Sequence, residues 1–145
     1  PVERASGLDR DLRRDHPYAG YDRIAVGVVT EQACDAHARS LVRTREIRES
    51  ITAIRHVLDR LEPGSVRADC PAPPGSEGLG WAEGPRGSLF YAVHIGADGR
   101  LARVKVKSPS FSNWWAFPFT VHESNMMDYA INEASFGLTI AGCDR

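Results

Sequence analysis

The sequence predicts an α+β fold, and three observations lead to this class. Apolar residues recur at helical spacing in residues 30–62, side chains alternate in residues 81–109, and aromatic residues are concentrated in residues 110–145. These patterns predict one long helix, a small antiparallel sheet with a β-hairpin, and a helical C-terminal segment. At 145 residues, we expect residues 1–145 to form a single domain.

The N-terminal residues 1–29 are polar, rich in arginine and interrupted by glycine and proline. This composition predicts a loop. The one exception is the segment Tyr21–Val29, where we expect a strand.

Residues 30–62 predict the long helix. Its isoleucines and leucines follow one another at steps of four and three, which places them on one helical face. They are Ile47, Ile51, Ile54, Leu58 and Leu61. Thr30 is the expected N-cap, and Pro63 and Gly64 end the helix. So small a domain cannot cover such a helix, so we expect it to lie along a partner segment or, in an isolated piece, a second copy of the chain.

Residues 63–80 are rich in proline and glycine and predict a linker loop. A short strand is expected at Leu79–Glu83. The segments Ser88–Ile95 and Leu101–Lys107 alternate around a Gly-Ala-Asp-Gly turn, which predicts a β-hairpin with one buried and one solvent-exposed face. The aromatic segment Asn113–Ala134 predicts one or two buried helices, with Pro118 near a first turn.

Composition excludes several classes of function. The net charge of −1 gives no electrostatic case for nucleic acid, and no apolar run approaches the length of a transmembrane helix. The three cysteines are far apart, and with the five histidines they form no spacing typical of a metal site, so we assign no metal ligand. The glycine-rich stretch 75–80 lacks the lysine and the flanking elements of a phosphate loop.

Arg86 and Glu83 are the candidate site residues, both within Glu83-Gly84-Pro85-Arg86-Gly87. Proline restricts one backbone angle and glycine permits close approach, so this segment is expected to hold the arginine rigidly at a strand start. An arginine held this way can polarise a bound group or orient an acid. A surface salt bridge between Arg86 and Glu83 is the simpler interpretation.

Several motifs taken together resemble the large-subunit family that contains nickel–iron hydrogenases and the hydrogenase-like subunit of respiratory complex I. The motifs are Arg4-Ala5-Ser6-Gly7, Asp11 to Tyr18, Tyr21-Asp22-Arg23, Leu41 to Arg43, Glu46 to Ile51, Glu83 to Gly87 and Leu101 to Phe111. They cover nearly the whole chain. The resemblance places the chain in the C-terminal part of that family, with the upstream half elsewhere, and puts Arg86 where the hydrogenase arginine overhangs the nickel–iron centre.

The C-terminal tail departs from the hydrogenase pattern. Aligned from Asp144 and Arg145, the two ligand cysteines of the hydrogenases fall on Thr139 and Gly142, and Gly137 replaces an aspartate. Neither replacement supplies the thiolate that such a metal binds. Cys143 lies one position beyond the second ligand site, and we expect no metal role for it.

The resemblance therefore implies part of a metal-free large subunit in a complex I-related, membrane-associated redox complex. It implies NADH and quinone as substrates of the whole assembly, iron–sulfur clusters in partner subunits, no cofactor within this chain, and contacts with an iron–sulfur subunit and a membrane arm. The expected location is the cytoplasmic side of the membrane. Two alternatives remain open: a true membrane-bound hydrogenase of the formate hydrogenlyase type with an aberrant tail, and a non-enzymatic assembly scaffold.

Overall fold

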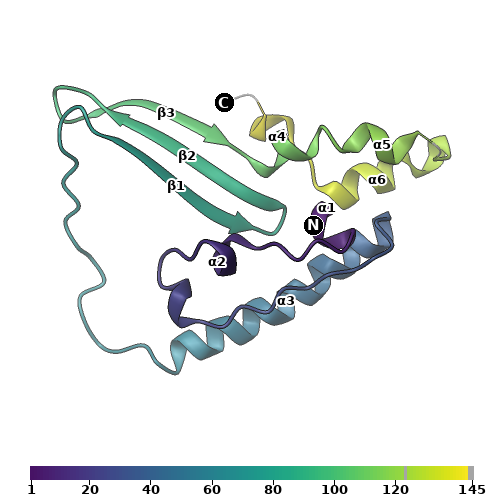
Figure 1. Cartoon of the computed structure of the whole chain (residues 1–145), viewed down its shortest axis with the longest axis horizontal. Coiled ribbons are helices and arrows are strands. Elements are labelled where there is room, and N and C mark those ends of the chain that lie inside the picture. The colour runs from purple at the N-terminus through teal and green to yellow at the C-terminus, as the bar shows by residue number, and fades with distance from the viewer. Residues whose placement is uncertain (123, 144–145) are drawn as a thin grey trace.

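A computed structural model describes residues 1–122 and 124–143, so Asp144 and Arg145 of the tail lie outside the described residues. The fold is α+β, as expected: one long helix, a three-stranded antiparallel sheet and a series of short C-terminal helices (Figure 1). The N-terminal half contains α1 (Val2–Ala5), α2 (Leu12–Asp15), the 3-10 turn η1 (Tyr21–Arg23) and α3 (Ala36–Leu58). The sheet contains β1 (Glu77–Gly84), β2 (Gly87–Ile95) and β3 (Leu101–Lys107). The C-terminal part contains α4 (Pro109–Asn113), α5 (Phe117–Val121), η2 (Met126–Asp128), α6 (Tyr129–Phe136) and η3 (Ile140–Gly142).

The predicted long helix is present but shorter than expected at both ends. Asp35, not Thr30, is the N-cap, and its side chain accepts the Ala38 N–H at 2.7 Å. Before it, the N–H groups of Glu31 and Cys34 donate to carbonyls of α1, so this stretch is held outside the helix. At the other end, the helix stops at Leu58.

The strand expected at Tyr21–Val29 is absent. A 3-10 turn occupies its first residues, and the remainder runs extended along α3 without pairing to a strand (Figure 1). Gly27 permits the close approach, because a Cβ there would lie 2.4 Å from Oε2 of Glu49. Packing against the helix has replaced pairing in the sheet.

The sheet confirms the predicted hairpin and the strand before it, which is longer than expected. Strands β2 and β3 pair with Val93 opposite Val104 and His94 opposite Arg103. The expected buried face is only partly buried: Tyr91 and Val104 are each 42% exposed, whereas Ile95 at the end of β2 is 7% exposed. In Figure 1 most of the sheet extends away from the helices.

The core is small and lies where α1, α3 and α6 meet. Ala5, Ala38 and Val42 are fully or almost fully buried, and Phe117 and Phe136 stack edge-to-face beside them. Pro118 lies in the first turn of α5, as predicted. The C-terminal helices are only partly buried, since Trp115, Phe119, Met126 and Met127 are all at least 76% exposed.

Candidate functional site

Glu83 is a buried carboxylate near the end of β1. Its side chain is 5% exposed, and its Oε2 accepts hydrogen bonds from Ser88 Oγ at 3.1 Å and the Leu12 N–H at 3.4 Å. On the free edge of β1, the Glu83 N–H donates to the hydroxyl of Tyr18 at 2.8 Å. The loop after α2 therefore docks on the strand edge and holds Glu83 in the interior.

Arg4 of α1 connects the carboxylates of three other segments. Its Nη1 donates to Oδ2 of Asp11 at 2.8 Å, and its Nη2 lies 2.9 Å from Oε1 of Glu46 and 3.5 Å from Oε1 of Glu83. The Arg4 side chain is 4% exposed. One buried guanidinium thus joins α1 to the start of α2, to α3 and to β1, and we call these residues together with Arg13 the Arg4 cluster.

Asp11 is the most strongly bound carboxylate of the Arg4 cluster. It caps α2 by accepting the Arg13 N–H at 3.0 Å, and the guanidinium of Arg13 binds it through Nε at 2.9 Å and Nη2 at 2.6 Å. Burial alone would raise the pKa of Asp11, but the hydrogen bonds from Arg13 outweigh it and hold the pKa below its ordinary value. Asp11 is therefore ionised at neutral pH.

The pKa values of Glu46 and Glu83 are shifted in the opposite direction. Burial raises the pKa of both carboxyl groups, and the attraction of Arg4 offsets this only in part. The ion pair between Arg4 and Glu46 lacks hydrogen-bond geometry, so Oε1 of Glu46 is buried without a hydrogen-bond partner among the described residues. Three carboxyl groups share two arginines, so the Arg4 cluster can hold a proton on Glu46 or Glu83.

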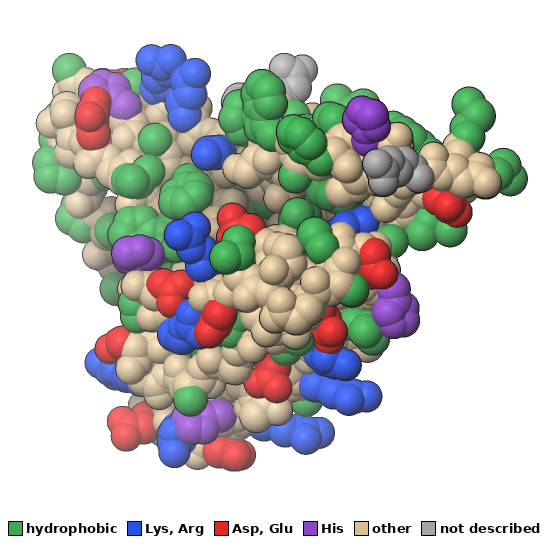
Figure 2. Space-filling view, turned by 45° about the vertical axis from the view of Figure 1, so that its right-hand side comes forward, with side chains coloured by type: hydrophobic (Ala, Val, Ile, Leu, Met, Phe, Trp, Pro, Cys, Tyr) green, Lys and Arg blue, Asp and Glu red, His purple; other side chains and the backbone are tan. Residues whose placement is uncertain are grey.

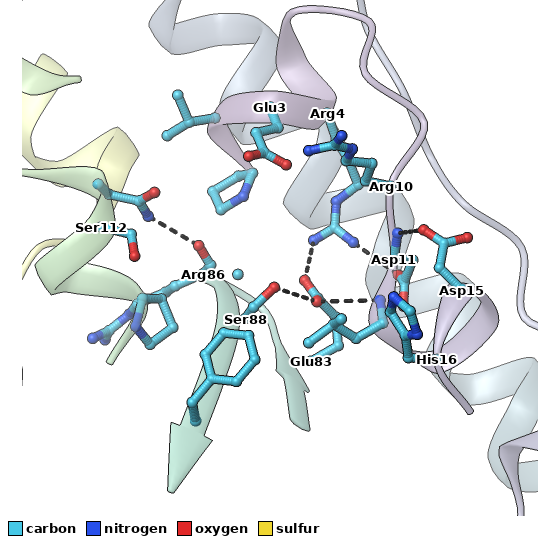
Figure 3. Close-up of a pocket in the computed structure, with 17 residues that line it drawn as sticks. Glu3, Arg4, Arg10, Asp11, Asp15, His16, Glu83, Arg86, Ser88 and Ser112 are labelled. Carbon is cyan, nitrogen blue, oxygen red and sulfur yellow. Dashed lines mark hydrogen bonds and ion pairs between the residues drawn. The ribbon is translucent and has the colours of Figure 1, made fainter. Parts of the chain in front are cut away.

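A pocket of about 630 Å³ opens beside the Arg4 cluster. Its lining comes from the N-terminal segment, from the β1–β2 hairpin and from α4 (Figure 3). Arg4, Asp11, His16, Glu83, Arg86 and Ser88 are among the residues that line it. Both candidate residues from the sequence therefore border one cavity, and burial raises the pKa of one of them, Glu83, above its ordinary value.

Arg86 does not pair with Glu83, so the expected surface salt bridge is wrong. Pro85 and Arg86 form the two-residue turn between β1 and β2, with Gly84 opposite Gly87. The Arg86 carbonyl accepts a hydrogen bond from Nδ2 of Asn113 at 3.0 Å, while Glu83 is directed toward Arg4 (Figure 3). The tight turn directs the two side chains to different neighbours.

In the described part of the tail, the two positions aligned with the hydrogenase ligands are occupied by Thr139 and Gly142, which lie in one turn. Oγ1 of Thr139 accepts the Gly142 N–H at 3.1 Å, and Gly142 has no side chain. Sγ of Cys143 donates to the Thr139 carbonyl at 3.5 Å, within the same turn. A hydroxyl, a hydrogen atom and one inward-turned thiol do not match a soft-metal site. Over the described residues, no three His, Cys, Asp or Glu side chains group as a metal site.

Sequence reasoning did not identify Arg4, Asp11 and Glu46 as site residues. Each was visible only as part of a motif, and charged side chains in a polar segment are usually solvated. The available signal was the arginine of the motif Arg4-Ala5-Ser6-Gly7, where small residues follow the charge. Sequence reasoning also missed Arg39, which is buried on the Phe136 ring and bound to Ser135 and Asn132.

Comparison with known proteins gives a consistent result along the chain. The family model described as the 49 kDa subunit of the respiratory-chain NADH dehydrogenase matches residues 1–74 and 67–145. Relatives named as subunits of NADH-quinone oxidoreductase include one from Geobacter metallireducens, 32% identical over 173 residues, and one from Clostridium beijerinckii, 36% identical over 149 residues.

A relative of the same name from Mycobacteroides abscessus is 32% identical over 191 residues. The three alignments cover 100% of this chain but only 44%, 40% and 44% of the relatives, so the chain spans less than half of their length. Since the two matches to the family model together span residues 1–145, the chain belongs to the family of the 49 kDa subunit of the respiratory-chain NADH dehydrogenase, the complex I branch of the resemblance.

Proposed function

We propose that the chain is the C-terminal part of the hydrogenase-like large subunit of a complex I-type NADH-quinone oxidoreductase, and that this large subunit works without a metal of its own. The observation that carries the proposal is the family match along the chain. The tail supports it, because Thr139 and Gly142 stand at the positions of the hydrogenase ligands and supply no thiolate.

Within that complex, the pocket beside the Arg4 cluster is the part of this chain that takes part in coupling. A buried carboxyl group with a raised pKa changes its protonation when the charge near it changes. Glu83 therefore binds or releases a proton as the redox state of a neighbouring centre changes. The pocket at Glu83 and Arg86 favours this role over that of a pure assembly scaffold.

The partners that we propose are an iron–sulfur subunit, a membrane arm and the remaining half of the same large subunit, at the inner face of the membrane. Support comes from the apolar faces that the chain leaves uncovered, on α3 and on the sheet. In the part of the chain that the structure describes, no helix combines the length and the hydropathy needed to cross a bilayer.

Metal analysis of the purified full-length complex tests the assignment to the complex I branch. We expect NADH-dependent quinone reduction, no stoichiometric nickel and no hydrogen-dependent dye reduction. Stoichiometric nickel together with hydrogen oxidation would instead identify a true hydrogenase with an unusual tail.

The proton-exchange role is tested by Glu83→Gln in the full complex, with Glu77→Gln as the matched control. Both glutamates lie in β1, but Glu77 is exposed at the far end of the strand, beside His94. We expect Glu83→Gln to lower quinone reduction by at least about tenfold, since a neutral amide cannot exchange a proton, and Glu77→Gln to leave it unchanged. Full activity of Glu83→Gln in an assembled complex would support the scaffold interpretation.

A further inference from the structure

Two arginine side chains from distant parts of the chain converge on Gly137. Arg43 comes from the middle of α3 and Arg86 from the β1–β2 turn, whereas Gly137 follows the last residue of α6. An ideal Cβ at Gly137 would lie 2.7 Å from Nη2 of Arg43 and 3.2 Å from Nε of Arg86. Both guanidinium groups therefore approach the same point, where the glycine has no side chain.

Only one of the two cations has acceptors there. Nη1 of Arg43 lies 3.3 Å and 3.5 Å from the carbonyl oxygens of Ala134 and Ser135, in the last turn of α6, where the Ala134 carbonyl also accepts the Gly137 N–H at 3.1 Å. The Arg86 guanidinium has no acceptor among the described residues, and neither arginine forms an ion pair with a described residue. Both arginines are half-buried.

No carboxylate of residues 1–122 or 124–143 forms an ion pair with either guanidinium group. Two like charges near one point repel each other, and partial burial strengthens the repulsion. The planar guanidinium groups present donors in a geometry that matches the two oxygens of a carboxylate. A carboxylate at this point would accept hydrogen bonds from both arginines and cancel the repulsion.

We propose that Arg43, Arg86 and the open face of Gly137 form a carboxylate-binding site. The carboxylate comes either from a neighbouring protein segment in the assembled complex or from a free carboxylic acid. The inference concerns a different set of contacts from the Arg4 cluster, and its tests measure binding and stability. Its outcome is therefore independent of the proton-exchange role of Glu83.

The first test places a carboxylate at position 137 itself. Gly137 has φ +64°, a conformation that Asn and Asp tolerate better than other residues with side chains, so Gly137→Asp and Gly137→Asn carry similar backbone costs. The two variants differ mainly in charge. We expect the melting temperature of Gly137→Asp, in the full-length protein, to exceed that of Gly137→Asn by about 2–4 °C. Equal melting temperatures, or a lower one for Gly137→Asp, would overturn the proposal.

The second test uses acetate as the probe. We expect sodium acetate to raise the melting temperature of the full-length protein in a saturable way relative to sodium chloride at the same ionic strength. Arg86→Gln and Gly137→Asp should abolish this increase, and Arg48→Gln, an exposed arginine elsewhere on α3, should retain it. No acetate effect, or one that survives Arg86→Gln, would contradict the site.

The same probe distinguishes the two sources of the carboxylate. If a neighbouring protein segment supplies it, acetate stabilises the isolated full-length protein but has no effect on the assembled complex, where the site is filled. If the ligand is a free acid, the assembled complex still responds to acetate and loses the response in Arg86→Gln. Both outcomes support the site and differ only in the occupant.

Discussion

At the scale of single residues, the Arg4 cluster contains carboxyl groups whose pKa values are shifted in opposite directions, although burial by itself raises the pKa of each. Asp11 receives three hydrogen bonds from Arg13 and one from Arg4, and its pKa is lowered. Glu83 shares Arg4 with two other carboxylates at a longer distance, and its pKa is raised. The number of charged donors that reach each oxygen accounts for the difference.

These opposite pKa shifts predict opposite pH effects on stability. The lowered pKa of Asp11 means that its ionised form stabilises the fold above the ordinary aspartate pKa, and this contribution is lost as the pH falls through the folded value. We expect Asp11→Asn to lower the free energy of unfolding by about 1.5–3 kcal/mol at neutral pH. The difference in unfolding free energy between Asp11→Asn and the wild type should become smaller as the pH falls.

For Glu83, the effect of pH on the stability of the fold has the opposite sign. Its raised pKa favours the fold below the ordinary glutamate pKa, and that contribution is lost as the pH rises through the folded value. Glu83→Gln should therefore gain stability relative to the wild type as the pH rises. Urea denaturation between pH 4 and 8 measures both variants, and parallel pH profiles for the two would contradict the shifts.

At the scale of elements, the start of α3 depends on a cap that the sequence pattern did not single out. Asp35 accepts the Ala38 N–H, whereas Thr30 lies in the extended segment that is bound to α1. Both residues have side chains suited to capping. What distinguishes them is that the chain from Glu31 to Cys34 is already engaged with the carbonyls of α1.

Two matched substitutions test the position of the cap. Asp35→Ala removes an N-cap hydrogen bond and should lower the free energy of unfolding by about 1 kcal/mol. Thr30→Ala removes a side chain with no capping role and should have little effect. Thermal unfolding followed by circular dichroism compares the two variants. A larger loss of stability in Thr30→Ala than in Asp35→Ala would indicate that the helix begins at Thr30.

At the scale of the whole molecule, the chain buries little of its apolar surface. Ile47, Ile51, Ile54 and Leu58 of α3 are between 44 and 63% exposed, and Tyr91 and Val104 of the sheet are each 42% exposed. Figure 2 shows charged side chains of both signs over the lower part of the view and more hydrophobic ones over the upper part, at the level of the sheet and the C-terminal helices. Since the chain spans less than half of its relatives, we expect their remaining residues to supply the cover.

Ile54→Ser tests this cover, with Val42→Ala as the reference. Val42 is fully buried within the chain, so its truncation should cost about 2 kcal/mol in the 145-residue chain and in the full-length protein alike. Ile54 is 58% exposed, so Ile54→Ser should have little effect in the 145-residue chain and cost about 1–3 kcal/mol in the full-length protein. If Ile54→Ser has an equally small effect in the 145-residue chain and in the full-length protein, the apolar face of α3 remains exposed to solvent in both.

The sequence by itself determined the order and type of the main elements. Helical periodicity located α3, and strict alternation located β2 and β3, because such patterns repeat over many residues and reflect local backbone geometry. The ordered motifs also identified the family. The prediction of a strand at Tyr21–Val29 was wrong because no local pattern shows which neighbour an extended segment packs against.

Only the tertiary structure determined which charged side chains lie together in the interior. Arg4, Asp11, Glu46 and Glu83 are separated by 7 to 79 positions, and only folding brings them to one guanidinium. The same holds for Arg43 and Arg86 at Gly137, which lie on three different elements. A charged residue has the same helix or strand propensity whether it lies in solvent or in the interior. Local sequence patterns can therefore predict helices and strands, but not which charged residues become buried together. That depends on contacts between distant segments.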